Sequence, residues 1–308
     1  MTDTETAPTT DQDPVPEAAS SRVPPLLEAM RPRQWTKNLL VLAGVIFANQ
    51  LLRSDLLCKA AGALVCFCLL SSSIYLFNDL VDREQDRAHP RKRLRPIASG
   101  RLSARTALTA GIVLAVISIG AGFAIRVQFG EMCAGFLALN ILYSLWMKHE
   151  VILDVLGVAA GFLVRAMAGA EAVNVKISAW LLICTVLLAL VISLGKRRQE
   201  LSSIKRAGEH RRVLQMYSLG LLDQLMTVVV SATLVAYLFY VFQSETALSH
   251  RWLPVTAPFV LYGVFRYLFL LHERGAGGAP EDLLFEDTRL RWAVIGWMAA
   301  AIIAMVLR

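Results

Sequence analysis

The sequence predicts an all-helical protein that crosses a membrane several times. Of its 308 residues, 56% are hydrophobic and 18% are charged, whereas a soluble domain is about half apolar and about a quarter charged. The mean hydropathy is +0.53. Apolar runs of about 20 residues, the length that a helix needs to cross the hydrocarbon core, recur along the chain with short charged segments between them. These observations favour a polytopic helical membrane protein.

The chain divides into a tail and one membrane domain. Residues 1–24 are rich in Thr, Pro, Ala, Asp and Glu and contain no Lys or Arg before Arg22, a composition typical of a disordered acidic tail. The tail lacks the positive first segment and the apolar segment of a signal peptide. Residues 25–308 hold the apolar runs, and we expect them to form a single transmembrane domain.

We expect nine spans, and the connections between them are too short for a soluble domain. The first is short, and we expect it to continue a helix that starts near Pro25. The nine apolar runs are residues 38–52, 59–78, 104–125, 129–147, 151–170, 177–195, 221–243, 252–271 and 289–307.

The basic residues indicate the orientation. They gather in the connections after the second and sixth spans, within residues 83–105 and 196–212. By the positive-inside rule, these loops and the N-terminus face the cytoplasm, and an odd number of spans leaves Arg308 outside. The net charge of +7 lies in loops between apolar runs rather than along a soluble face, which argues against nucleic acid as a partner. We therefore expect a multi-pass protein of the cytoplasmic membrane.

An aspartate motif follows the second span. In N-D-L-V-D-R-E-Q-D, residues 78–86, a continued helix places Asp79, Asp82 and Asp86 within about 60 degrees of one another. Like charges that close destabilise a helix unless a cation neutralises them, and hard oxygen ligands suit Mg²⁺ that bridges substrate phosphates. We therefore predict that the three aspartates are catalytic metal ligands, and that Asn78 adds an amide contact to the substrate.

The alternative for this motif is a solvated helix end whose acids pair with Arg83 and Arg87. The spacing and the position at a membrane exit favour the metal site. The pattern N-D-x-x-D-x-x-x-D after the second of nine spans resembles the UbiA superfamily of intramembrane prenyltransferases. The resemblance implies a nine-helix bundle with a cytoplasm-facing active-site cavity, in which Asp79, Asp82 and Asp86 hold Mg²⁺ on a diphosphate substrate.

The segment after the sixth span differs from most of that superfamily. Typical aromatic prenyltransferases carry a second aspartate motif there, but this chain has G-K-R-R-Q-E-L-S-S, residues 195–203. Lys196, Arg197 and Arg198 instead put cations where an anionic substrate can dock, with Glu200 one turn beyond Lys196. The alternative is a positive-inside anchor with a helical pair between Lys196 and Glu200.

This departure resembles one branch of the superfamily, the decaprenyl-phosphate phosphoribosyltransferases. The resemblance implies that phosphoribosyl pyrophosphate supplies the diphosphate, that a polyprenyl phosphate is the acceptor, and that the product feeds a lipid-linked arabinose donor for cell-envelope polysaccharide. It extends over nearly the whole chain after the tail, through R-P-R-Q-W-T-K-N (31–38), H-P-R-K-R-L-R-P-I-A-S-G (89–100), L-W-M-K-H (145–149), L-V-R-A-M-A-G (163–169), G-K-R-R-Q-E-L (195–201) and A-P-E-D (279–282).

The residue types suit that chemistry in their own right. A metal clamp on a diphosphate stabilises it as a leaving group while positive charge develops at the anomeric carbon of the ribose. The acceptor phosphate is already a nucleophile and needs cationic positioning more than a strong base. Lys37, Lys148, Lys196 and Arg197 are the candidates for holding the phosphates, and none is assigned to one of the two substrates.

Other polar residues give weaker signals. Arg33 lies one turn before Lys37, where an interfacial snorkelling role and a substrate contact are both open. Tyr143, at the end of the fourth span, is a candidate substrate contact or a residue of the interfacial aromatic belt. Glu281, Asp282 and Asp287 lie in the last cytoplasmic loop, where we expect Pro280 to open a short helix with acids in its first turn, and a capping role is favoured for them.

The fifth span carries a polar stripe. Asp154, Gly161 and Arg165 lie at i, i+7 and i+11, which places them along one line of the helix, and we expect this stripe to face a cavity. An arginine so far into a span must face protein or water rather than lipid. Arg165 is therefore a phosphate contact or cavity wall, or alternatively part of an ion pair that joins two spans.

Two other functions remain as alternatives. A prenyltransferase that attaches an isoprenoid to an aromatic ring, in quinone or haem biosynthesis, predicts acids where residues 196–198 are basic. A transporter of phosphorylated solutes predicts paired helix breaks near the midplane, and the sequence offers no convincing pair. The oligomeric state is open, and a homo-oligomer is one of the possibilities.

Overall fold

The computed structural model describes residues 23–47, 53–90, 92–207, 216–273, 283 and 286–307, and these residues form helices and short connections without a strand. The elements follow one another as α1 (Pro25–Ala29), η1 (Pro32–Leu42), α2 (Ala43–Phe47), α3 (Ser54–Val81), α4 (Arg83–Ala88), η2 (Lys92–Leu94), α5 (Ala104–Ile125), α6 (Val127–Leu145), η3 (Met147–His149), α7 (Leu153–Val173), α8 (Ala179–Ala207), α10 (Leu219–Gln243), α11 (Glu245–Ser249), η4 (Leu253–Thr256), α12 (Ala257–Glu273) and α14 (Thr288–Val306).

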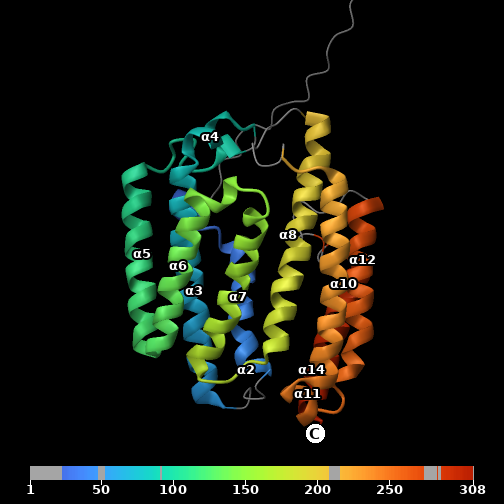
Figure 1. The fold of residues 1–308 in the computed structure, drawn as a ribbon. Helices are drawn as coiled ribbons and strands as arrows, with labels where there is room; N and C mark the ends of the chain where they lie inside the picture. The colour runs from blue at the N-terminus through green and yellow to red at the C-terminus, as the bar shows by residue number, and fades with distance from the viewer. Residues whose placement is uncertain are drawn as a thin grey trace, which may run out of the picture.

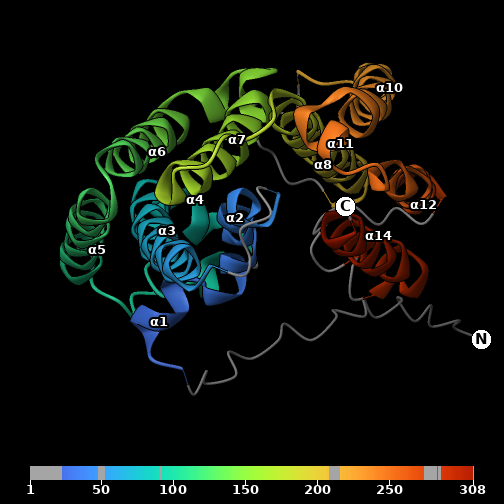
Figure 2. The same cartoon turned by 90° about the horizontal axis from the view of Figure 1, so that it is seen from below.

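The long helices stand side by side and alternate in direction, so successive connections lie at opposite ends of the molecule (Figure 1). Seen along the bundle, α5, α6, α7, α8, α10, α12 and α14 follow one another in an arc, and α2 and α3 lie on its inner side (Figure 2). The short helix α4, the η3 turn and the last turns of α8 lie at one end, and the C-terminus lies at the other (Figure 1). The two basic loops therefore start from the same end of the bundle, as the sequence predicts.

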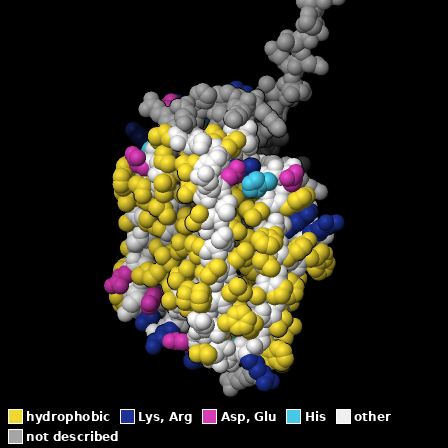
Figure 3. Space-filling model, turned by 45° about the vertical axis from the view of Figure 1, so that its right-hand side comes forward, with side chains coloured by type: hydrophobic (Ala, Val, Ile, Leu, Met, Phe, Trp, Pro, Cys, Tyr) yellow, Lys and Arg dark blue, Asp and Glu magenta, His cyan; other side chains and the backbone are white. Residues whose placement is uncertain are grey.

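Eight helices in the described part of the chain are long and apolar enough to cross a membrane. They coincide with the second to ninth predicted spans, and apolar side chains cover the middle of the face in Figure 3 while charged side chains lie near its two ends. This distribution fits a hydrocarbon layer between two polar surfaces. The fold class predicted from the sequence is confirmed as a polytopic helical bundle.

The first predicted span differs from the expectation of one continued helix. A helix does begin at Pro25, but it ends at Ala29, and Arg31 adopts a left-handed conformation with φ of 54°. The chain then continues as the 3₁₀ helix η1 and the short α2, and residues 48–52 lie outside the described residues. The break follows from Pro32, because the residue before a proline is disfavoured in the α conformation.

Close backbone contact fixes this broken segment in the bundle. A Cβ atom on Gly169 of α7 would lie 1.8 Å from the carbonyl oxygen of Val41, and one on Gly44 would lie 2.7 Å from the Cα atom of Ala170. Any larger side chain at either glycine would force the two segments apart. Small residues of this kind let helix backbones approach closely in membranes. The polar residues of η1 are thereby held against α7.

Side chains cap the first turns of three long helices. Ser103 accepts a hydrogen bond from Thr106 N at the start of α5, and Ser218 accepts one from Leu221 N at the start of α10. Asp287 accepts one from Leu290 N at the start of α14 and pairs with Arg266 of α12 at 2.6 Å. Asp287 therefore has a capping role at α14, whereas the short helix predicted to open at Pro280, with Glu281 and Asp282, lies outside the described residues.

Candidate active site

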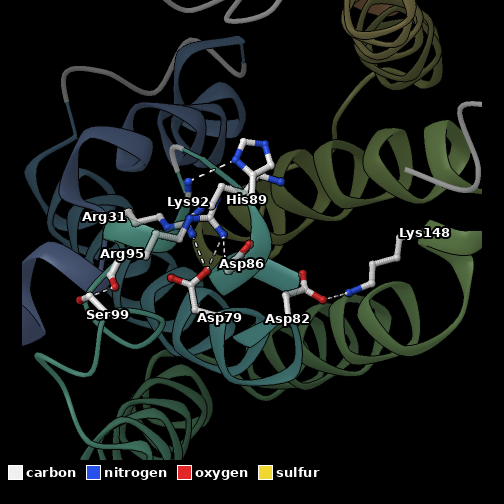
Figure 4. A network of polar contacts seen from close by, with 9 residues as sticks. All are labelled: Arg31, Asp79, Asp82, Asp86, His89, Lys92, Arg95, Ser99 and Lys148. Atoms are coloured by element: carbon white, nitrogen blue, oxygen red, sulfur yellow. Dashed lines mark hydrogen bonds and ion pairs between the residues drawn. The ribbon is translucent and has the colours of Figure 1, made fainter. Parts of the chain in front are cut away.

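The aspartate motif lies where α3 ends. The helix stops at Val81, Asp82 has φ of −88° and ψ of 4°, and α4 starts at Arg83. This junction turns the three carboxylates away from the single face that a continued helix would give. Asp79 and Asp86 point toward one another, whereas Asp82 points to the other side (Figure 4).

Asp79 and Asp86 share one cation. The Arg95 guanidinium donates to Asp79 Oδ1 at 3.2 Å and to Asp86 Oδ2 at 2.6 Å. Arg31 donates to the same Asp79 oxygen at 2.5 Å, and its guanidinium lies 5.2 Å from the centre of the Tyr75 ring. Both carboxylates are only 3% exposed, so their negative charges are stabilised mainly by these two arginines.

Asp82 has a cation from another part of the bundle. Lys148 Nζ, in η3 between α6 and α7, donates to Asp82 Oδ1 at 2.5 Å, and the lysine side chain is 9% exposed. The motif therefore joins three separate segments, because its partners come from the start of η1, from the connection after α4 and from η3 (Figure 4). Lys148 is brought to the aspartates, as the prediction of a shared phosphate site requires.

Two buried polar atoms beside these carboxylates have no hydrogen-bond partner among the described residues, the amide oxygen of Asn78 and the Nε of Arg83. Buried polar atoms are normally paired in folded proteins, so such atoms mark a place where a ligand can bind. Carboxylate and amide oxygens are the donors that Mg²⁺ prefers. The donor chemistry of Asn78 and the aspartates therefore fits a magnesium ion.

The carboxylates are not arranged as a ready-made metal cage. In the described ranges, no three His, Cys, Asp or Glu side chains are grouped as metal ligands. The ion pairs keep the three carboxylates apart, because Arg95 binds Asp79 and Asp86 while Lys148 binds Asp82. A metal ion would have to take the places that these cations hold.

A second ionic cluster joins α7, α8 and the residues before α10. Arg197 is 5% exposed and donates to Asp154 Oδ2 at 2.6 Å and to Glu200 Oε2 at 2.5 Å. The Tyr217 hydroxyl donates to the other Asp154 oxygen at 2.7 Å. Lys196, the next residue along α8, is exposed. The two neighbouring bases are thus placed differently, with Arg197 in the protein interior and Lys196 at its surface.

The predicted stripe of α7 faces protein at both ends. Asp154 is fully buried in its ion pair with Arg197, so the alternative of an ion pair between two spans describes Asp154. Arg165 donates to Asn38 Oδ1 of η1 at 2.9 Å and to the Gly161 carbonyl at 3.0 Å, and its guanidinium lies 4.5 Å from the centre of the Phe136 ring. Within the described residues, Arg165 therefore joins α7 to η1 through neutral partners.

The remaining candidates lie around these clusters. Lys37 and Thr36 line a groove of about 370 Å³ between η1, α2, α7 and α8, whose other lining residues are mainly apolar and include Phe162 and Leu188. Arg33 is exposed beside this segment. The ring of Tyr143 packs on Gly157 of α7, where a Cβ atom would lie 2.7 Å from it.

Reasoning from the sequence missed two arginines of the site, Arg31 and Arg95. Both lie in segments that carry the resemblance to phosphoribosyltransferases, and both directly precede a proline. A proline keeps the preceding residue out of the α conformation, so each Arg-Pro pair marks a turn from which a long side chain can leave the helix direction. The two Arg-Pro pairs are visible in the sequence. The carboxylate that they reach is not, because Asp79 lies 48 residues from Arg31 and 16 residues from Arg95.

Comparison with known proteins agrees with this architecture. The model of the UbiA prenyltransferase family matches residues 38–285. This chain therefore belongs to the UbiA prenyltransferase family.

Curated relatives cover most of the chain. It is 34% identical over 287 residues to a decaprenyl-phosphate phosphoribosyltransferase of Mycolicibacterium smegmatis. The alignment covers 89% of this chain and 90% of that protein. The chain is 32% identical over 288 residues to the protein of that name from Corynebacterium glutamicum, 91% of this chain and 86% of the relative. Among solved structures, a UbiA homologue from Archaeoglobus fulgidus bound to DMAPP and Mg²⁺ aligns with a TM-score of 0.71 at 18% identity, covering 92% of this chain and 99% of that one. The last likeness shows the fold.

Proposed function

We propose that this protein transfers the 5-phosphoribosyl group of phosphoribosyl pyrophosphate to a polyprenyl phosphate and releases diphosphate. The observation that carries the proposal is the whole-length similarity to proteins named decaprenyl-phosphate phosphoribosyltransferase. The geometry agrees with it, because three carboxylates and three cations meet at the end of the bundle where α8 carries Lys196 and Arg197 rather than a second aspartate motif. The product would be a lipid-linked pentose phosphate for envelope polysaccharide synthesis.

Magnesium is the metal that the donor set fits, held by Asp79, Asp82 and Asp86 with the amide oxygen of Asn78 beside them. When bound, it would neutralise charge on the leaving diphosphate. Arg31, Arg95 and Lys148 then lose their carboxylate partners, and each can donate to phosphate oxygens within the same site.

Positioning of the acceptor falls to residues on the other side of the site. Lys37 lies at an apolar groove between η1, α2 and α8, and this groove suits a polyprenyl tail whose phosphate meets the lysine. Lys196 is exposed and available to an anionic substrate, and Arg33 is exposed near the groove. The acceptor phosphate attacks the anomeric carbon as the diphosphate departs, so the protein needs to align the two phosphates and exclude water.

Four of the residues predicted to contact the substrates act on them indirectly, by fixing the positions of the helices that line the site. Buried Arg197 pairs with buried Asp154 and with the partly exposed Glu200, and the first of these pairs holds α8 against α7. Arg165 holds η1 against α7, and Tyr143 packs on Gly157. These contacts place the groove lined by Lys37 and the turn that carries Lys148, and both must be aligned for transfer.

We further propose that the aspartates face the cytoplasm. The support is the positive-inside rule, since the loops within residues 83–105 and 196–212 start from one end of the bundle and carry the clustered bases. Phosphoribosyl pyrophosphate is a water-soluble cytoplasmic metabolite, so this orientation gives the site direct access to its donor.

The test is a comparison of donors. Membranes that contain the protein are supplied with Mg²⁺ and either labelled phosphoribosyl pyrophosphate with a polyprenyl phosphate, or a labelled isoprenoid diphosphate with an aromatic acceptor. We expect label in a new lipid from the first pair and no product from the second. The reverse result would replace the proposal with an aromatic prenyltransferase, and membranes with Asp82→Asn serve as the matched background.

A further inference from the structure

The turn that carries Lys148 is held in an unfavourable backbone conformation. Ile152 has φ of 71° and ψ of −44°, close to a strained γ-turn, and it stands directly before α7. A positive φ is a genuine outlier for a β-branched residue and persists only where the surroundings impose it. The side chain does not impose it by burial, because Ile152 is 47% exposed.

A buried hydroxyl bonds to the backbone of this residue, whose carbonyl also accepts from Val155 N and Leu156 N of α7. The Ile152 amide donates to the Tyr217 hydroxyl oxygen at 2.7 Å, and the same hydroxyl donates to Asp154 at 2.7 Å. Tyr217 is 5% exposed, and burial together with its bond to the Asp154 carboxylate raises its pKa well above the usual range, so it remains a neutral donor. Asp154 is in turn fixed by Arg197 of α8. The Ile152 amide is therefore tied to a buried network that joins α7, α8 and the residue Tyr217 before α10.

The conformation of this turn decides where Lys148 points. Only three residues separate Lys148 from Ile152, and backbone hydrogen bonds from His149 to Trp146 and from Glu150 to Met147 make the intervening chain compact. At the far end of this chain, Lys148 reaches Asp82 at 2.5 Å. A rotation at Ile152 would therefore turn the segment that bears the lysine.

We propose that Tyr217 is a positioning residue, which holds Ile152 in its strained conformation and thereby keeps the Lys148 ammonium on the aspartate site. The proposal deepens the phosphoribosyltransferase function and rests on it for the role of Lys148 in turnover. The placement of Lys148 itself is a structural statement that can be measured separately.

Two substitutions separate positioning from packing. Tyr217→Phe keeps the ring and removes only the hydroxyl, so the Ile152 amide loses its acceptor. Adding Ile152→Gly to that variant removes the strain, because glycine adopts positive φ readily. Strain of the size typical for such a residue shifts a conformational equilibrium by about 5- to 150-fold. The matched control is Tyr267→Phe, since Tyr267 lies in the same buried cluster and its hydroxyl has no hydrogen-bond partner among the described residues.

Two readouts are taken for the four proteins. The first is kcat/KM for transfer from labelled phosphoribosyl pyrophosphate to a polyprenyl phosphate. The second is the acetylation rate of Lys148 by an amine-reactive ester without substrate, measured by peptide mass spectrometry relative to the exposed Lys196. The second readout reports where Lys148 lies whether or not the chain has the proposed activity.

We expect Tyr217→Phe to lower kcat/KM and to raise the relative acetylation of Lys148, each by about tenfold, as loss of a constraint on a strained turn requires. Adding Ile152→Gly should restore both, while the thermal stability stays reduced because Asp154 still lacks its hydroxyl donor. Tyr267→Phe should behave as the unmodified protein. Unchanged acetylation in Tyr217→Phe, or a loss that Ile152→Gly does not restore, overturns the proposal. If the unmodified protein transfers no label, the proposed function fails and the acetylation ratios alone decide the role of Tyr217.

Discussion

Replacing Arg95 by Met should make the stability of this protein depend on magnesium. Arg95 is the cation shared by Asp79 and Asp86, and both carboxylates are buried. Methionine preserves much of the side-chain volume but removes the charge and all the donors. Without the guanidinium, Asp79 keeps Arg31, whereas Asp86 loses the cation that the structure gives it.

The size of the effect follows from burial. Removing one partner of a buried ion pair destabilises a protein by about 3–5 kcal/mol. The Arg95 side chain is 29% exposed and Asp79 retains a second arginine, so solvent screening and the remaining pair reduce the loss to about 2 kcal/mol. For a chain of 308 residues, such a loss lowers Tm by about 3 °C.

Magnesium should reverse that loss. In Arg95→Met the metal no longer competes with the guanidinium, and a ligand at a hundred times its Kd adds about 2.7 kcal/mol to the folded state. The unmodified protein should gain less, because binding must first displace Arg95 from Asp79 and Asp86. The rise of Tm on adding Mg²⁺ should therefore be larger in Arg95→Met than in the unmodified protein.

The measurement is thermal unfolding in detergent with Mg²⁺ or with a chelator. Arg101→Met is the matched control, because Arg101 lies on the same connection and pairs with Glu28 at 2.8 Å in an exposed ion pair, worth about 0–1 kcal/mol. It should lower Tm slightly and leave the response to Mg²⁺ unchanged. An equal response to Mg²⁺ in Arg95→Met and the unmodified protein would refute the reasoning, as would a response that survives when Asp86→Asn is added.

Three further predictions concern activity. Asp79→Asn and Asp82→Asn should each abolish transfer while the protein remains folded in membranes, because the metal clamp is lost; near-normal turnover of both in the lipid-labelling assay would contradict the assignment. Chelation of divalent ions should stop transfer by the unmodified protein, and added Mg²⁺ should restore it. Lys196→Glu should raise the apparent KM for a phosphate substrate and leave Tm unchanged, because Lys196 is exposed. Arg197→Met should lower Tm, because it leaves Asp154 buried without its cation. Identical effects of the two substitutions on KM and Tm would show that burial does not distinguish the two residues.

The sequence predicted the membrane helices well, because about 20 apolar residues in succession are a direct consequence of bilayer thickness. It predicted less well where a helix breaks. Residues 38–52 were expected to be a short span continuing a helix from near Pro25, but Pro32 and the contact of Gly169 with Val41 make the described part of this segment a broken element. Such a contact depends on two segments more than 100 residues apart, and local periodicity does not report it.

The candidate site was also predicted only in part. The spacing of Asp79, Asp82 and Asp86 pointed to one end of the bundle as the site, and the structure brings Lys148 to Asp82 there. The roles of these residues in binding phosphate stay predictions. The expectation that the three aspartates share one face was wrong, because α3 ends before Asp82. Tyr217 was not singled out, since a lone tyrosine beside a basic loop carries no local signal and its role arises from its contacts with Ile152 and Asp154.

The proposed transfer of the phosphoribosyl group is tested most directly by following each phosphate of the donor. Phosphoribosyl pyrophosphate is prepared with radioactive phosphorus in either the 5-phosphate or the diphosphate, and each form is incubated with the purified protein, Mg²⁺ and a polyprenyl phosphate. We predict that the 5-phosphate label enters the lipid while the diphosphate label is released in equal amount as free diphosphate, and that Asp82→Asn does neither. Diphosphate label in the lipid, or no transfer from either form while an isoprenoid diphosphate is consumed, would contradict it.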